Sequence, residues 1–312
     1  MPIPKIVFFI SVMMLVVSAT KIPFAEGGSA QLTVQGVGET SRVSKTNSET
    51  KSSLLEIDTE MVSCLQDCQR QNQMAAVGFE VIRAQCQKEC RFKKALSRAG
   101  SDIREERTEG IKTLCELADP RGVPLLIEAL RRDMKERTGL WAWIIPGLGA
   151  SRDPRAVPVL LETLNKIDDD WLGREMSAQA LGDIGDQSAT PALLRAVWRA
   201  DTRDAAIIAL AGMNDPRAIE ALLSALQPEE SPEAREAAMA GLQRLGTAAV
   251  PAMVEAFAEY FRESPQTQRR LWLCQLLGTS SDELAVQALG QSLNDPDPAV
   301  RQCAADQMKS GQ

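Results

Sequence analysis

One twelve-residue pattern returns six times in the 312-residue chain, and it constrains the fold more than any other feature. Three copies open with Asp-Pro-Arg and continue with an apolar helical pattern, as in DPRAVPVLLETL at 153–164. A period of about 30 to 35 residues is typical of helix pairs that stack into an α-solenoid. The sequence therefore predicts an all-α repeat protein. The copies cover residues 119–130, 153–164, 186–197, 215–226, 246–257 and 282–293.

Each part of the pattern has a physical role. The opening aspartate can cap the second helix of a pair, and proline is tolerated in its first turn. Apolar residues at helical spacing then face the core. The first helices, such as REMSAQALGDIG at 174–185, are rich in alanine and glycine, so close packing between layers is expected. With a polar half repeat at the end, we expect about six and a half helix pairs over residues 101–312.

These motifs resemble HEAT-like repeats, of the short type found in phycobilin lyase subunits. The resemblance implies a fold rather than a function, because lyases, scaffolds and hydroxylases share the repeat. The Asp–Arg ladder of the family implies a structural role for four first-helix arginines. The residues that carry the resemblance are Asp119-Pro120-Arg121, Asp153-Pro154-Arg155, Asp215-Pro216-Arg217 and DPDPAVRQCAA at 295–305, and the ladder arginines are Arg174, Arg203, Arg235 and Arg301.

The composition excludes several classes of function. The chain has no histidine, which removes histidine-based triads, histidine-ligated zinc and the His-Glu iron sites of the deoxyhypusine hydroxylases that share this repeat. Its net charge of −7, without a basic run, disfavours binding to nucleic acid. We therefore predict no catalytic residue, no metal site and no cofactor, and a protein or peptide as the partner.

Four of the seven cysteines form two C-x3-C pairs on helices expected at 57–74 and 79–98. In an antiparallel hairpin the numbers of facing residues have a constant sum, and this register selects Cys64–Cys90 and Cys68–Cys86. In an oxidising compartment such thiols form disulfides, whereas a four-thiolate zinc site or a redox-active pair are the alternatives. The predicted hairpin, residues 57–99, resembles the twin C-x3-C hairpins of small oxidatively folded proteins.

The three remaining cysteines lie within apolar helical patterns, where a buried thiol behaves as a small hydrophobic residue. A bridge between Cys274 and Cys303 stays open, and the odd total leaves at least one cysteine unpaired. The third is Cys115.

The first 25 residues have the layout of a secretory signal peptide. Lys5 precedes an apolar run of 14 residues, which is shorter than the roughly 20 residues that span a bilayer. Residues 26–56 are rich in serine, threonine and glycine, so we expect a flexible linker. The sequence thus predicts a periplasmic or secreted protein without stable membrane insertion after cleavage; a retained N-terminal anchor is the alternative.

A solenoid of this kind exposes one face of its second helices, which we expect to form a concave partner-binding surface. Trp198 is the expected anchor on this face, although it could instead cover a repeat junction as the edge of the core. The predicted partner-binding residues are Arg131, Glu162, Arg195, Trp198 and Glu255.

Two further segments need an interpretation. Residues 139–149, GLWAWIIPGLG, are apolar on all sides, which favours burial, for example beneath the cysteine hairpin, over an interface. Pro146 should kink or end this helix. The three aspartates at 168–170 are expected to cap a helix rather than to bind calcium.

The sequence as a whole predicts an exported, non-enzymatic scaffold or adaptor that binds a protein. The alternatives are a lyase-like chaperone or enzyme for a tetrapyrrole or other prosthetic group, and a redox protein that uses the cysteine pairs.

Overall fold

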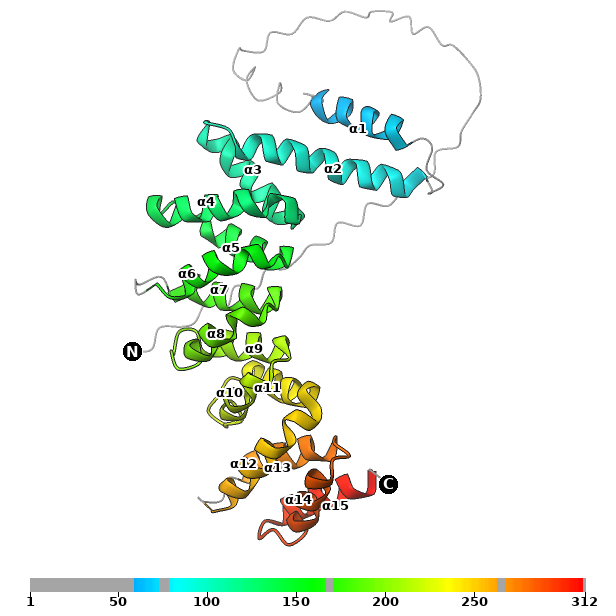
Figure 1. Ribbon diagram of the computed structural model, residues 1–312, viewed down its shortest axis with the longest axis vertical. Coiled ribbons are helices and arrows are strands. Elements are labelled where there is room, and N and C mark those ends of the chain that lie inside the picture. Colours follow the sequence, from blue (N-terminus) through cyan, green and yellow to red (C-terminus); the bar gives the residue numbers. More distant parts are fainter. Residues whose placement is uncertain (1–58, 73–78, 167–170, 263–266, 311–312) are drawn as a thin grey trace, which may run out of the picture. The chain divides into compact units, whose positions relative to one another are not determined.

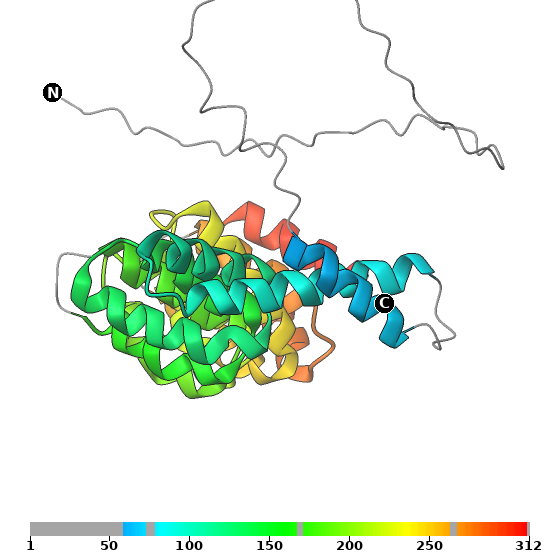
Figure 2. The same cartoon turned by 90° about the horizontal axis from the view of Figure 1, so that it is seen from above.

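The computed structural model describes residues 59–72, 79–166, 171–262 and 267–310, which belong to one compact unit, residues 56–312. The predicted signal peptide (1–25), the predicted linker (26–56) and the aspartates at 168–170 lie outside the described residues. Every regular element in the described ranges is a helix (Figures 1 and 2). No helix in these ranges is both long enough and apolar enough to cross a membrane.

The first two helices form the predicted cysteine hairpin. Helices α1 (Thr59–Asn72) and α2 (Phe79–Ala99) are joined by disulfides Cys64–Cys90 and Cys68–Cys86, with Cα–Cα distances of 5.8 and 5.6 Å. The predicted pairing is confirmed, and it leaves none of these thiols free to bind zinc. Because the bridges close loops of 26 and 18 residues, each stabilises the hairpin by roughly 3 kcal/mol.

Six helix pairs and a final single helix follow in chain order, which confirms the predicted six-and-a-half-repeat solenoid (Figure 1). The first helices are α3 (Arg104–Leu117), α5 (Trp141–Ser151), α7 (Trp171–Ile184), α9 (Arg203–Met213), α11 (Pro232–Leu245) and α13 (Thr267–Gly278). The second helices are α4 (Val123–Glu136), α6 (Val157–Leu164), α8 (Thr190–Ala196), α10 (Ile219–Ser224), α12 (Val250–Arg262) and α14 (Glu283–Ser292), and α15 (Pro298–Ser310) is the terminal half repeat.

The opening aspartates cap short 3-10 turns that lead into the second helices. The carboxylates of Asp119, Asp153 and Asp215 each accept a hydrogen bond from the backbone N–H two residues later. The 3-10 turn and the following helix thus begin with satisfied donors, as the sequence predicted. In the fifth pair the turn starts at Gly246, and no side chain caps it.

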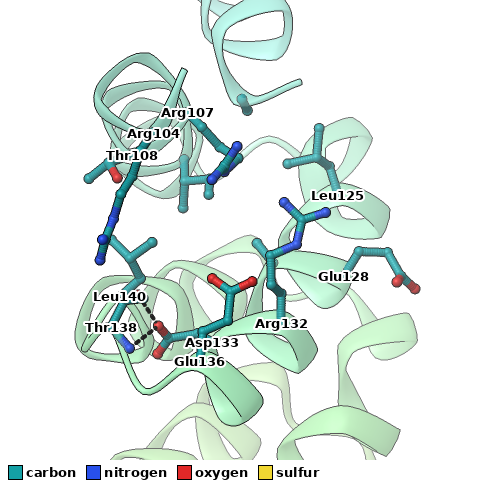
Figure 3. Close-up of a pocket in the computed structure, with 13 residues that line it drawn as sticks. Arg104, Arg107, Thr108, Leu125, Glu128, Arg132, Asp133, Glu136, Thr138 and Leu140 are labelled. Carbon is teal, nitrogen blue, oxygen red and sulfur yellow. Dashed lines mark hydrogen bonds between the residues drawn. The ribbon is translucent and has the colours of Figure 1, made fainter. Parts of the chain in front are cut away.

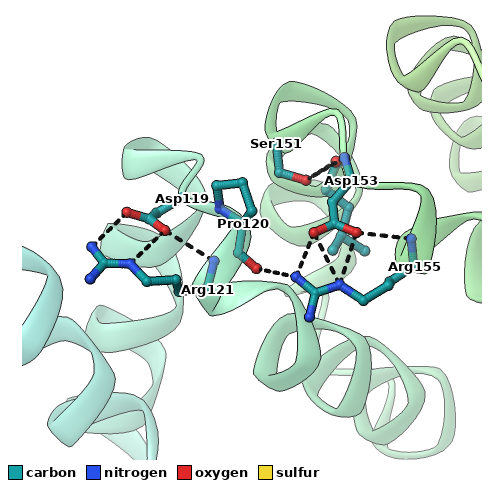
Figure 4. Close-up of polar contacts among 7 residues, drawn as sticks. Asp119, Pro120, Arg121, Ser151, Asp153 and Arg155 are labelled. Carbon is teal, nitrogen blue, oxygen red and sulfur yellow. Dashed lines mark hydrogen bonds and ion pairs between the residues drawn. The ribbon is translucent and has the colours of Figure 1, made fainter.

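The arginines of the Asp-Pro-Arg motifs link successive turns. The guanidinium of Arg155 lies against Asp153, and its Nη2 donates to the backbone carbonyl of Pro120, 2.8 Å away in the preceding turn (Figure 4). Arg217 contacts the Gln187 carbonyl in the same way, at 3.0 Å. Arg121, in the first turn, instead contacts Glu89 of α2 at 2.8 Å. It therefore ties the cysteine hairpin to the solenoid.

The first helices pack so closely that their contacts need small residues. A Cβ placed on Gly182 of α7 would lie 2.7 Å from the Cα of Ala209 in α9, and one on Gly149 of α5 would lie 2.9 Å from the Cα of Ala180. Real side chains do not approach a backbone this closely. The predicted role of alanine and glycine between layers is therefore confirmed.

Most of the wholly apolar segment 139–149 lies in α5. This helix packs between α3 and α7 rather than beneath the cysteine hairpin. Ile144, Ile145 and Leu148 are fully buried there. Pro146 lies inside the helix, so the expectation that it might end the helix is wrong. The preceding turn faces solvent at this point, because Pro146 itself is exposed.

Arginines on the first helices bind the loops that join successive layers. Arg174 donates to Asp201 at 2.7 Å and Arg203 donates to Glu230 at 2.7 Å. Arg235 contacts backbone carbonyls of the loop before it and lies over the ring of Trp272, and Arg301 contacts the carbonyls of residues 295 and 296. The structural role that the resemblance implied for these arginines matches these contacts.

The last layer carries a third disulfide, Cys274–Cys303, between α13 and α15. The sequence had left this bridge open. Cys115 is the remaining cysteine; it is buried against Gly147, where an added Cβ would lie 2.6 Å from the Cβ of Cys115. Burial raises the pKa of the Cys115 thiol to about 12, so the thiol stays protonated and unreactive.

Candidate partner-binding face

The five predicted partner-binding residues lie on the solvent side of the second helices or directly after one. We call this surface, on α4, α6, α8, α10, α12 and α14, the second-helix face. All five side chains are exposed: Arg131, Glu162, Arg195, Trp198 and Glu255.

Trp198 is the most exposed large apolar side chain in the described ranges, at 78%. It follows the last turn of α8, where its backbone N–H donates to the carbonyl of Arg195. The alternative that it covers a repeat junction as core edge is therefore wrong. Next to it Arg199 pairs with Asp201 at 3.4 Å, and Arg174 also binds that aspartate. Arg203 of α9 donates to the Val197 carbonyl at 3.0 Å, so the turn that carries Trp198 is held by α7 of its own layer and by α9 of the next.

Arg131 and Glu162 are brought together across two layers. The Arg131 guanidinium on α4 lies 3.1 Å from Glu162 on α6 and 3.6 Å from Glu128 one turn away. Both members are exposed, so the pair contributes only about 0–1 kcal/mol to stability. These charges remain accessible to a partner.

A groove opens between the second helices α12 and α14. It has a cavity volume of about 330 Å³ and is lined by the apolar side chains of Val254, Phe257 and Ala288 together with the amides of Gln291 and Asn294. This volume is at the lower limit of pockets that enclose a small molecule. The groove suits one apolar side chain of a partner, with amides at its rim to orient the neighbouring backbone.

A smaller and more polar cavity, of about 80 Å³, lies between α3 and α4 (Figure 3). Its acid Asp133 is buried and accepts hydrogen bonds from the backbone N–H of Thr138 and of Trp141, so it holds the start of α5. Arg107 donates to the Ser101 carbonyl at 3.0 Å. These roles are structural, and the volume admits only a few water molecules.

The acidic and cysteine side chains of the described ranges serve mainly in caps, ion pairs and disulfides. Within the described ranges no three histidine, cysteine, aspartate or glutamate side chains gather as metal ligands would. The carboxylates with lowered pKa values, such as Asp119 and Asp153, owe the shift first to hydrogen bonds from Arg121 and Arg155. Such shifts accompany structural ion pairs as well as active sites.

Sequence reasoning missed the buried ion pair between Arg270 and Asp295, at 3.0 Å. Arg270 continues the arginine ladder in α13, and an alignment of all first helices would have placed it there. That the second helices form a concave surface stays a prediction. The close approaches at glycines between layers join first helices, as at Gly182 and Ala209.

Two family models match the repeat region. One, described as HEAT repeats, matches residues 140–203 and 198–263, and the other, a PBS lyase HEAT-like repeat, matches residues 106–132. Among solved structures, human deoxyhypusine hydroxylase in complex with glycerol is similar at 19% sequence identity, over 72% of this chain and 97% of that chain, with a TM-score of 0.36. No curated protein matches the sequence.

The matched residues coincide with the first five helix pairs, from α3 to α12. The capped turns, the arginine ladder and the glycine contacts recur in these same pairs. Residues 106–132 and 140–263 are therefore HEAT-like repeats, and a disulfide-linked helical hairpin precedes the solenoid that contains them.

Proposed function

We propose that this protein is an exported, non-enzymatic scaffold that holds a protein or peptide on its second-helix face. The observation that carries the proposal is Trp198, which is 78% exposed on a turn that two layers hold in place. Tryptophan and arginine are the side chains most often found at the energetic centre of protein interfaces. Trp198 lies three residues from the exposed Arg195.

The chemistry of the face suits a polypeptide better than a polyanion. The Arg131–Glu162 pair presents both signs of charge within 3.1 Å, and Glu255 adds a further acid on α12. A nucleic acid would need a basic track. The groove between α12 and α14 adds an apolar recess with amide groups, which an apolar side chain and its backbone can occupy.

Export is supported by the oxidation state of the cysteines. Three disulfides join six of the seven cysteines, and such bridges persist in oxidising compartments. The predicted signal peptide at residues 1–25 would deliver the chain there. N-terminal sequencing of the mature protein checks this part of the proposal: cleavage after Ala19 or Ala25 supports it, and an intact Met1 in the cytosol contradicts it.

The alternative function is a lyase-like chaperone or enzyme for a tetrapyrrole, which the PBS lyase HEAT-like match at residues 106–132 favours. The two cavities described above, at about 80 and 330 Å³, are small for a tetrapyrrole. An absorption band above 350 nm in protein purified from its native source would favour this alternative.

Photocrosslinking tests the scaffold function directly. A photoreactive phenylalanine analogue replaces Trp198 in the full chain, and a matched variant carries it at Val81, which is 58% exposed but lies on α2, outside the second-helix face. We expect one stoichiometric protein adduct at position 198 in the native envelope.

The same adduct at both positions, or none at position 198, contradicts the assignment of the face. Trp198→Ala should abolish co-purification of the adduct protein without lowering the melting temperature, because the side chain makes little contact with the core. Turnover of a small molecule by the pure protein would overturn the non-enzymatic assignment.

A further inference from the structure

The opposite surface of the solenoid has a different chemistry. We call the solvent side of α7, α9 and α11 the first-helix face. Here the ladder arginines Arg174, Arg203 and Arg235 are each followed in sequence by an acid; two of these acids are exposed and the first is half-buried. The three acids are Glu175, Asp204 and Glu236, one in each of three successive helices.

The arginines nearest to these acids in sequence are engaged with other groups. Arg174 and Arg203, their neighbours in sequence, point into the layers and bind Asp201 and Glu230. Arg244, the basic residue of α11 near this face, donates to the Ala211 carbonyl at 2.6 Å. No ion pair to any of the three acids is present among the described residues, so their charge is uncompensated.

The neighbouring negative charges affect the titration of Glu175. Its pKa is raised, first by partial burial and then by the negative charges of Asp204 and Asp201. A cation placed between the layers would relieve both contributions. The acids are spread one to a layer, and within the described ranges no cluster could hold a metal ion. A partner that balances these acids would therefore carry several positive charges along its length, which a single metal ion cannot do.

Large apolar side chains lie among the acids. Trp171 is 55% exposed, Leu172 41% and Ile208 40%. Ile208 lies one turn after Asp204 on the same side of α9. Exposed apolar groups framed by charges of one sign are typical of interaction surfaces. A molecule that covers this face therefore needs both apolar and basic groups.

We propose that the first-helix face binds an amphipathic helix whose basic side chains are spaced seven residues apart, with apolar residues between them. Packed helices lie about 8–10 Å apart, so acids in successive layers repeat at about that distance. A helix rises about 1.5 Å per residue, and seven residues therefore cover about 10 Å. Basic residues at positions i, i+7 and i+14 match the three acids along one side of the partner helix.

The probe is a synthetic 15-residue peptide with lysine at positions 1, 8 and 15, leucine at 4, 5, 11 and 12, and alanine and glutamine elsewhere. A control peptide has the same composition and the same leucines, but the lysine of position 8 is exchanged with the residue of position 10, which lies on the far side of the helix. Binding to the full oxidised chain is measured by fluorescence anisotropy at low salt. We expect the spaced peptide to bind at least about tenfold more tightly than the control.

The variant Glu175→Gln/Asp204→Asn/Glu236→Gln should weaken binding by about tenfold or more. A matched variant, Glu109→Gln/Glu220→Gln/Glu259→Gln, removes the same charge from exposed positions of α3, α10 and α12 and should leave binding unchanged. Ile208→Ser provides a second test that keeps all acids, with an expected loss of about threefold. Circular dichroism establishes that each variant is folded.

Equal binding of the two peptides overturns the proposal, and so does equal weakening by the two triple variants. The proposal is independent of the scaffold function on the second-helix face, because Trp198→Ala should not alter peptide binding. A charge swap gives the converse result: Glu175→Lys/Asp204→Lys should select a peptide in which glutamate replaces the three lysines.

Discussion

Replacing Gly182 by alanine should destabilise the protein, although alanine is the better helix former. The new Cβ would lie 2.7 Å from both the Cα and the Cβ of Ala209, and ordinary contact begins at 3.4 Å. Helices α7 and α9 must therefore separate by roughly 1 Å, and a gap of this size forfeits a quarter to a half of each dispersion contact.

Two opposing effects set the change in the free energy of unfolding. Overpacking of this kind costs about 1–3 kcal/mol, and the exchange of glycine for alanine in a helix returns about 0.5–1 kcal/mol. We expect a net loss of about 1–2 kcal/mol. Gly212 of α9 is the matched control, because no atom lies within 4 Å of a Cβ placed there. Gly212→Ala should leave stability unchanged or raise it by up to about 1 kcal/mol.

Urea unfolding followed by circular dichroism compares the two variants with the unaltered chain. The midpoint should fall for Gly182→Ala and should not fall for Gly212→Ala. If Gly182→Ala were as stable as Gly212→Ala, the layers would not be in close contact at this point. The reasoning that glycine and alanine set the layer spacing would then be refuted.

Three further predictions concern the cysteines and the buried charges. Native protein should not react with iodoacetamide at pH 9, because the pKa of Cys115 is about 12. Denaturant without reductant should expose one reactive thiol per chain. Three or more reactive thiols per chain would contradict the disulfides. Asp215→Asn should lower the free energy of unfolding by about 2 kcal/mol at pH 7. Hydrogen bonds from Arg217 lower the pKa of Asp215 from 3.8 to about 2. The stability that this carboxylate contributes is therefore complete above about pH 4 and is lost as the pH falls towards 2, so urea unfolding should show the two proteins converging at low pH. Asp295→Ala should cost about 3–5 kcal/mol by removing the carboxylate from a buried pair, whereas Arg270→Met/Asp295→Asn should cost clearly less in the same assay.

Local chemistry made much of the fold predictable. The Asp-Pro-Arg motifs marked the start of α4, α6 and α10, because the cap, the proline and the apolar spacing act within a few residues of one another. The pairing of Cys64 with Cys90 followed from hairpin register alone. Both features depend on short distances along the chain, which a sequence displays directly.

Contacts between layers were harder to foresee. Cys274 and Cys303 occupy different positions within their helices, so their 29-residue separation does not reveal that they meet. The acids after the ladder arginines were likewise overlooked, since only the stacking of α7, α9 and α11 places Glu175 beside the charge of Asp204. The exposure of Trp198 depended on where α8 ends, which periodicity locates only to within a residue or two.

The disulfides lie in the hairpin that precedes the first layer and in the last layer, and the described layers between them have none. Stacked repeats ordinarily fray from their ends, because a terminal repeat has one neighbour instead of two. In the oxidised protein both ends are covalently restrained, so the interior around α9 and α10 becomes the place where opening begins. Hydrogen exchange should accordingly be fastest in the middle of the solenoid, and reduction should move the fastest exchange to its ends.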